Sequence, residues 1–154
     1  MAFQTGYLTG RESRIWDLRR WNNSQSEIGR KLGISRQAVH RALQIIDSKV
    51  ERALTEVADI NKLEVRSLNL VDGIMEAYSP AYRVPVIVSF SRANGLKVWY
   101  LYEGNCSECG NEKTCRRMLE AEAEERGIEL SGADGNPSPS QLALKIFSRF
   151  MEAL

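Results

Sequence analysis

The 154-residue sequence has one histidine, three cysteines and four prolines. It contains no apolar run of the roughly 18 residues that a membrane-spanning helix needs, and its N-terminus has no charged stretch followed by an apolar one. We therefore expect a soluble, cytoplasmic protein that is not exported. With a single histidine, and with no Ser-His-Asp set, phosphate loop or paired carboxylates, we expect no catalytic residues and no enzyme.

The net charge of +1 hides an asymmetry between the two halves of the chain. Residues 1–66 hold 12 Lys and Arg against 8 Asp and Glu, whereas residues 67–154 hold 9 against 12. This modest bias predicts that only the first half meets a polyanion. The length and the 43% hydrophobic content allow one large core or two small ones.

Two capping boxes mark helix starts in the first third of the chain. Thr9 precedes Glu12 by three residues, which predicts a helix from about residue 10 to residue 21, and Asn22 and Asn23 should end it. Ser24 and Glu27 repeat the pattern at the start of a second helix. The apolar residues at helical spacing, which should face the core, are Ile15, Trp16, Leu18, Trp21, Ile28 and Leu32.

A tight turn should follow the second helix. Gly33 can adopt the left-handed conformation that the turn requires, Ile34 fills the corner, and Ser35 can cap a third helix. Gly29 is small enough to let that helix cross closely, and Val39 and Leu43 fall on its buried side. Two capped helices around a glycine turn are the pattern of a helix-turn-helix.

The segment "LTGRESRIWDLRRWNNSQSEIGRKLGISRQAVHRAL" resembles the helix-turn-helix of LuxR-type regulators and of the fourth region of primary sigma factors. They share the L-T-x-R-E opening and the E-I-A-x-x-L-G-I-S core. The archaeal Tfx-type regulators, which follow a similar motif with a long helix, resemble the chain as a whole. Gly29 stands where the family usually has Ala, a change between small residues, and Asn-Asn replaces the usual Gly-containing exit from the first helix.

The resemblance implies binding to double-stranded DNA, with helix 36–44 in the major groove. Arg36 can pair with guanine and Gln37 with adenine through two hydrogen bonds, whereas Arg30 should lie nearer the phosphates. The alternative is a helical hairpin whose polar face is merely solvated, and an isolated surface histidine is usually neither ligand nor base. The expected DNA-binding residues are Gln25, Ser26, Arg30, Ser35, Arg36, Gln37, His40 and Arg41.

The third helix should continue without a break to about residue 61, because its apolar residues recur in steps of three and four. A helix this long cannot bury such a stripe alone. The stripe either pairs two copies of the chain in a homodimer, which we favour, or packs on the C-terminal part of the same chain. Its members are Leu43, Ile46, Val50, Ala53, Val57 and Ile60.

After Leu63 the apolar residues no longer recur at the helical spacing of three and four residues. "KLEVRSL" alternates weakly, "LVDGIMEAY" is compatible with a short helix, and "VPVIVSFSRANGLKVWYLYEG" holds two β-rich runs around "RANG", a hairpin signal. We expect a small antiparallel sheet over about residues 63–103 with one helix against it. Trp99, Tyr100 and Tyr102 should be core and sheet-face residues rather than a ligand box.

Two further helices are expected near the C-terminus. Thr114 should cap a helix from Cys115 to Arg126, with Glu122 and Arg126 as an i,i+4 pair and Gly127 as the stop. A Gly, Pro and Ser linker follows. The tail "SQLALKIFSRFMEAL" then predicts an amphipathic helix that covers the domain, with Leu142, Ile146, Phe147, Phe150 and Leu154 on its apolar side.

All three cysteines lie within ten residues in the spacing C-x2-C-x5-C. This trio resembles that of the oxygen-sensing fumarate and nitrate reductase regulators, which hold an iron-sulfur cluster with a fourth cysteine that this chain lacks. Cys106, Cys109 and Cys115 could ligate zinc or such a cluster with a further donor, form a disulfide or thiol switch, or be inert structural thiols. The helix N-terminus predicts a lowered thiol pKa for Cys115.

The sequence therefore predicts an α+β protein in three parts. Residues 1–44 form a helix-turn-helix domain, residues 45–62 a long dimerisation helix, and residues 63–154 a C-terminal α+β domain that dimerises or senses. The expected function is a homodimeric, sequence-specific transcriptional regulator. One alternative is a regulator gated by redox or metal at the cysteine cluster, and a more distant one is a thiol oxidoreductase using Cys106 and Cys109.

Overall fold

The structure is a computed structural model that describes residues 7–130 and 135–151. Its helices are α1 (Gly10–Arg20), α2 (Gln25–Leu32), α3 (Arg36–Ile60), α4 (Glu112–Glu125) and α5 (Pro139–Phe147), with 3-10 turns η1 (Cys106–Glu108) and η3 (Ser148–Phe150). Its strands are β1 (Glu64–Asn69), β2 (Ile74–Ser79), β3 (Val84–Ser91) and β4 (Gly95–Tyr100). The class is α+β, as expected. None of the helices in the described ranges is long and apolar enough to cross a membrane.

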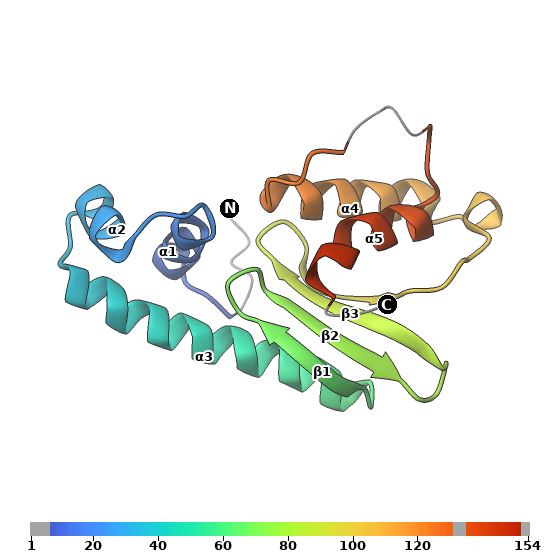
Figure 1. The fold of residues 1–154 in the computed structure, drawn as a ribbon, viewed down its shortest axis with the longest axis horizontal. Helices are drawn as coiled ribbons and strands as arrows, with labels where there is room; N and C mark the ends of the chain where they lie inside the picture. The colour runs from blue at the N-terminus through green and yellow to red at the C-terminus, as the bar shows by residue number, and fades with distance from the viewer. Residues whose placement is uncertain (1–6, 131–134, 152–154) are drawn as a thin grey trace.

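The sheet lies between two helical layers (Figure 1). The long α3 runs along one face, whereas α4 and α5 cover the other. Helices α1 and α2 pack on the first half of α3, beyond the ends of the strands, so the molecule is elongated along α3 (Figure 1). The first turns of α3 therefore lie far from the sheet, and their outer side is exposed to solvent.

Local capping starts the first two helices where the sequence indicated. Thr9 accepts a hydrogen bond from the Glu12 backbone over 3.2 Å while Glu12 accepts one from Thr9, and Ser24 and Glu27 form the same reciprocal pair. Asn22 takes a positive φ of 61°, which ends α1. One expectation was wrong: Trp21 does not face the core but is 61% exposed at the C-terminal cap of α1.

Helix α3 ends at Ile60, one residue from the expected end, and buries its apolar stripe within the chain. Ile46, Val50 and Ala53 have no exposed surface in the single chain, because they pack against α1 and the sheet. Ile60 is 79% exposed. The part of the stripe from Leu43 to Ala53 thus follows the intrachain alternative rather than the favoured pairing of two chains, whereas Val57 is half-buried and Ile60 is exposed.

The sheet is antiparallel throughout, in the order β1-β2-β3-β4. The "RANG" segment turns between β3 and β4 as expected, with Ser91 opposite Gly95. The segment "LVDGIMEAY" is not a short helix, because Gly73 at φ 66° closes a turn and residues 74–79 pair with both neighbouring strands. A Cβ at Gly73 would lie 2.6 Å from the Phe90 carbonyl oxygen, so the turn needs glycine for space as well as for its backbone angle.

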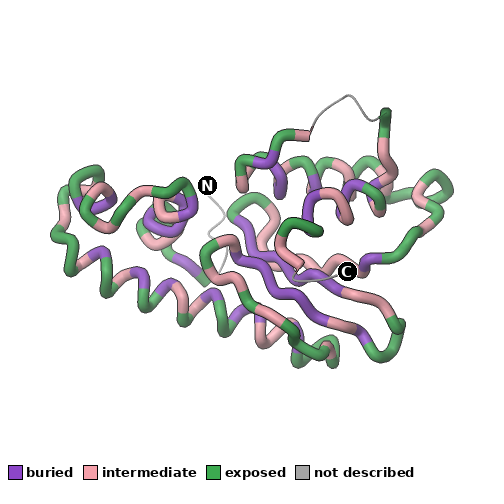
Figure 2. Tube along the Cα trace, viewed as in Figure 1, coloured by how far each residue is buried: buried purple, intermediate pink, exposed green. Residues whose placement is uncertain are grey.

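Alternation along the strands divides the apolar residues between two cores. On β3, Val86, Val88 and Phe90 face the α3 side, whereas Ile87 faces α4 and α5. Figure 2 shows the resulting buried residues along the central strands and along one side of α3. The first core runs without interruption from α1 and α2 into the sheet, so the hydrophobic core does not divide at residues 44 or 62.

The helices of the second layer differ in detail from expectation. Helix α4 begins at Glu112, because the Cys115 N–H already donates to the Asn111 carbonyl over 2.9 Å, so Thr114 lies inside the helix and does not cap it. Helices α4 and α5 both lie over this face of the sheet (Figure 1). Helix α5 starts with a capping box of Ser138 and Gln141 and buries Leu142, Ile146 and Phe147. Leu154, expected on the same side, and residues 131–134 of the linker lie outside the described residues.

A buried polar network fastens α4 to the sheet. The side chain of Glu122 is fully buried, forms the expected ion pair with Arg126, and accepts hydrogen bonds of 3.1 Å from the hydroxyls of Ser89 and Ser91. Arg126 in turn donates to the carbonyl oxygens of Asp72 and Phe90. These partners satisfy both charges, which burial would otherwise make strongly unfavourable.

Candidate nucleic-acid interface

The connection between α2 and α3 is a tight turn built around two glycines. Gly33 adopts the left-handed conformation at φ 68°, and the Ile34 N–H donates to the Gly29 carbonyl over 2.9 Å. Ser35 then caps α3 by accepting a hydrogen bond of 3.1 Å from the Ala38 N–H. The roles expected for Gly33 and Ser35 are thereby confirmed, and they set the direction in which α3 leaves the turn.

The space around Gly29 is smaller than we expected when we treated glycine and the family's usual alanine as interchangeable small residues. A Cβ at this position would lie 2.6 Å from the Ile34 carbonyl oxygen, which is closer than any ordinary contact. Because the obstructing atom belongs to the backbone, it can move only if the turn moves. Alanine is therefore not an equivalent residue at position 29 of this chain.

The outward side of the α2–α3 unit carries the residues expected to bind DNA. Four of them, Arg36, Gln37, His40 and Arg41, are exposed on successive turns of α3 and, together with the half-buried Gln25 of α2, line one shallow hollow. Three more, Ser26, Arg30 and Ser35, are exposed but lie outside that hollow. The structure thus brings five of the eight expected residues together.

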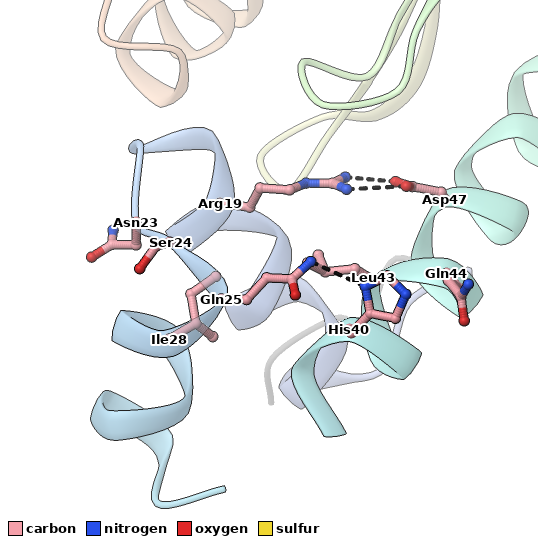
Figure 3. Close-up of a pocket in the computed structure, with 9 residues that line it drawn as sticks. All are labelled: Arg19, Asn23, Ser24, Gln25, Ile28, His40, Leu43, Gln44 and Asp47. Carbon is pink, nitrogen blue, oxygen red and sulfur yellow. Dashed lines mark hydrogen bonds and ion pairs between the residues drawn. The ribbon is translucent and has the colours of Figure 1, made fainter. Parts of the chain in front are cut away.

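Gln25 and His40 connect the two helices at the centre of this surface. The amide nitrogen of Gln25 lies 3.2 Å from Nδ1 of His40, and Figure 3 shows this contact between the start of α2 and α3. The amide can donate here only if Nδ1 is the unprotonated nitrogen, which leaves Nε2 with the ring proton. His40 then has one nitrogen engaged inside the protein and one available to a ligand.

A second hollow adjoins the first and contains residues that sequence reasoning missed. Arg19 and Asp47 close its side with two hydrogen bonds of 3.0 and 2.6 Å, and Gln44 lies on its rim (Figure 3). Gln44 follows His40 by four residues, so the helical spacing that selected Arg36, Gln37, His40 and Arg41 could have found it. The Arg19–Asp47 pair joins α1 to α3 and has no local sequence signal.

Two backbone N–H groups at the start of α2 are not free to bind a phosphate. The N–H groups of Ser24 and Glu27 are already used in the capping box. Hydrogen bonds from the side chain and the backbone N–H of Ser24 lower the pKa of the Glu27 carboxyl, so Glu27 is ionised at neutral pH. A negative charge at this helix end opposes the attraction of the helix dipole for an anion.

The three cysteines lie at the far end of the molecule, around η1 and the first turns of α4. Cys109 is exposed, whereas Cys106 and Cys115 are half-buried, and the Cys106 thiol lies 3.7 Å from the Ser140 hydroxyl. Among residues 7–130 and 135–151, no group of three His, Cys, Asp or Glu side chains is arranged to hold a metal ion. The described geometry therefore offers no ready zinc or iron-sulfur site.

The expectation of a lowered thiol pKa at Cys115 was wrong. Burial raises the pKa of the Cys115 thiol above its ordinary value, and the neighbouring thiolates of Cys109 and Cys106 raise it further. The helix begins three residues before Cys115, so this thiol does not stand at the helix terminus itself. A raised pKa disfavours the thiolate that nucleophilic or redox chemistry requires.

Comparisons of the chain with protein-family models, with curated protein sequences and with solved structures found no match.

Proposed function

We propose that this chain is a sequence-specific DNA-binding regulator of transcription that reads the major groove with the first turns of α3 and forms a homodimer through a surface other than the buried part of the α3 stripe. The observation that carries the proposal is the exposed row of Arg36, Gln37, His40 and Arg41, which stands on a capped helix supported by α2. Arg and Gln are the side chains that most often pair with guanine and adenine edges through two hydrogen bonds.

The packing beneath these four side chains favours DNA recognition over a polar face that is merely solvated. Ile28 and Val39 are fully buried under the α2–α3 unit, the Arg19–Asp47 pair joins α1 to α3, and Gly33 fixes the turn. A recognition helix has to present its side chains at fixed positions, because base-edge hydrogen bonds depend on geometry. A helix held by packing on two neighbours meets that requirement better than a free one.

The experiment that tests the proposal is selection of bound sequences from a random pool of double-stranded DNA. We expect enrichment of one motif, and an inverted repeat would support the homodimer as well. A variant with Arg36→Ala and Gln37→Ala should lose the enrichment, whereas the charge-matched control Arg117→Ala, on the exposed side of α4, should keep it. Recovery of no motif by the unmodified chain would refute sequence-specific binding.

A second candidate function, a regulator gated by oxidation of the cysteines, has one observation in its favour. All three thiols lie at one end of the molecule, around η1 and in the first turns of α4, near enough for Cys109 and Cys106 to raise the pKa of the Cys115 thiol in addition to burial. Replacing all three with Ser distinguishes the candidates. Equal DNA affinity of the triple variant and the unmodified chain, under both oxidising and reducing conditions, would leave only the ungated regulator.

A further inference from the structure

Three tyrosine side chains gather at the end of the sheet that lies next to the C-terminus of α3. Tyr82, Tyr100 and Tyr102, together with Val84, line a hollow on the α3 side of the sheet. Tyr82 is 70% exposed and Tyr102 57% exposed. Core packing therefore does not account for Tyr82 and Tyr102, although the sequence favoured that interpretation for Tyr102, whereas Tyr100 packs against the first core as expected. The hollow is at the opposite end of α3 from the candidate DNA interface.

The backbone brings these residues together from two neighbouring strands. Tyr100 pairs with Val86, and the Leu101 N–H donates to the Pro85 carbonyl over 2.9 Å, so the pairing continues past the end of β4. Residues two apart on a strand share a face, which places Val84 with Val86. Tyr102 lies in a bend beyond the end of β4, where its N–H donates to the Tyr100 carbonyl over 3.1 Å, and this turn leaves its ring at the hollow.

The turn between β2 and β3 supplies the third ring. The Tyr82 N–H donates to the Ser79 hydroxyl over 3.3 Å and the Arg83 N–H to the Ser79 carbonyl over 2.7 Å, which folds Tyr82 back toward β4. Its ring then meets that of Tyr100 edge to face, with centroids 5.2 Å apart and planes at 80°. Two perpendicular aromatic rings form adjoining walls of a box, and Val84 lies beside them.

The size of the hollow favours a small ligand over a protein partner. An aromatic side chain offers roughly 150 to 250 Å² in all, so the exposed parts of Tyr82 and Tyr102 amount to about 200 to 300 Å². A stable protein interface buries about 800 Å² on each partner. The exposed aromatic surface falls well short of that area but is enough to cover one small molecule.

The chemistry of the lining selects the class of ligand. None of the residues that line the hollow in the described parts of the chain is charged. Tyrosine rings carry negative electrostatic potential on their faces, which attracts cations. A quaternary ammonium group suits such a site because it has no N–H that must find a hydrogen-bond acceptor. The exposed Glu103, next to Tyr102 in the chain, adds a negative charge near the hollow, which the exposed Arg83 on the other side of Tyr82 offsets.

We propose that the hollow formed by Tyr82, Val84, Tyr100 and Tyr102 binds a small quaternary ammonium group, with the tyrosine rings as its walls. The close passage of the chain at Gly104 helps to hold one wall in place. A Cβ there would lie 3.3 Å from the Tyr102 ring, so the chain passes directly against that ring. A larger residue at position 104 would displace the ring.

The test is calorimetric titration of the full chain with choline and with 3,3-dimethylbutan-1-ol, its neutral isostere of nearly the same shape. Choline should bind at least tenfold more tightly, because only the cation interacts with the ring faces. Tyr102→Leu, which removes one wall, should weaken choline binding by roughly five- to tenfold. Tyr102→Phe keeps the ring and should retain most of the affinity, and circular dichroism of each variant checks that it folds.

Equal binding of choline and the neutral alcohol would overturn the proposal, since it would show an apolar site that ignores charge. Binding of neither compound at millimolar concentration would overturn it as well. The quaternary ammonium group could belong to a modified protein tail or to a free small molecule, and a peptide that carries trimethyl-lysine distinguishes these two sources. Tighter binding of that peptide than of both choline and the unmethylated peptide would assign the site to a modified protein tail. Weaker binding than choline would assign it to a free small molecule.

Discussion

The indole nitrogen of Trp16 donates a hydrogen bond of 3.1 Å to the carbonyl oxygen of Leu70. This bond joins α1 to the turn between β1 and β2, two elements separated by fifty-four positions in the chain. The same indole packs on the Phe90 ring at 5.2 Å and lies under the Arg20 guanidinium at 4.2 Å. Trp16 thus fixes the N-terminal helices on the sheet.

Replacement of Trp16 by Phe should reduce the free energy of unfolding by roughly 1 to 3 kcal/mol, because it leaves the half-buried Leu70 carbonyl without its donor and a gap beside Phe90. Urea denaturation measures the change. The matched control is Trp21→Phe, whose indole is exposed and which should alter stability by less than about 0.5 kcal/mol. Equal effects of the two changes would show that Trp16 does not hold the junction.

A second prediction concerns Gly29. Alanine normally stabilises a helix interior by about 1 kcal/mol relative to glycine. Here the added Cβ would meet the Ile34 carbonyl oxygen, so we expect Gly29→Ala to destabilise the protein despite the helix preference. Gly10→Ala is a control in α1, where a Cβ meets nothing within 4 Å. A rise in melting temperature for Gly29→Ala would show that the turn has room to adjust.

DNA binding should respond differently to changes in α2 and α3. Arg36→Ala should weaken binding to the selected sequence by about 1 to 3 kcal/mol and relax the preference at one base pair. Arg30→Ala should weaken binding to all sequences alike and reduce the slope of log affinity against log salt by about one. Fluorescence anisotropy over a series of salt concentrations measures both. Intact affinity and preference in Arg36→Ala would remove that residue from the interface.

The stability of the α1–α3 contact should depend on pH through Glu12. Burial opposes ionisation of Glu12, but hydrogen bonds from Lys49 and Thr9, together with the Lys49 charge, outweigh it and lower the pKa of the carboxyl. A lowered folded-state pKa gives stability that is present above the unfolded pKa of about 4.3 and is lost as the pH falls through the folded value. The Lys49 ammonium lies 2.8 Å from this carboxylate, so the effect belongs to the packing of α1 on α3.

Glu12→Gln should therefore destabilise the protein by on the order of 1 kcal/mol at neutral pH and by much less near pH 3. Chemical denaturation at the two pH values measures the difference. Glu56→Gln is the control, because Glu56 pairs with Arg52 on the exposed side of α3 and should have little effect at either pH. A loss in Glu12→Gln that does not change with pH would exclude the ionised carboxylate as its cause.

Cys115 should react slowly with alkylating reagents. Because burial and the adjacent thiolates raise the pKa of its thiol, iodoacetamide at about pH 8 should modify the exposed Cys109 first, and the Cys115 rate should rise as the pH increases above 9. Mass spectrometry of timed digests follows each thiol separately. Faster reaction at Cys115 than at Cys109 would restore the lowered pKa that its position near a helix start suggested.

The sequence by itself determined the local elements. The capping pairs Thr9–Glu12 and Ser24–Glu27 and the left-handed turn at Gly33 involve residues within a few positions of one another, so their patterns are visible in the chain. The same holds for the hairpin around "RANG" and for the i,i+4 pair of Glu122 and Arg126. The exposed row Arg36, Gln37, His40 and Arg41 followed from the resemblance to a helix-turn-helix together with helical spacing.

Only the tertiary structure decided what the apolar stripe of α3 packs against. Heptad spacing describes the stripe equally well for a coiled coil and for a helix on a sheet, because both bury one side of a helix. The choice depends on contacts with β3 and the other strands, which come much later in the chain. The lack of space at Gly29, the raised pKa of Cys115 and the meeting of Tyr82 with Tyr100 have the same origin, since each depends on atoms that folding brings near.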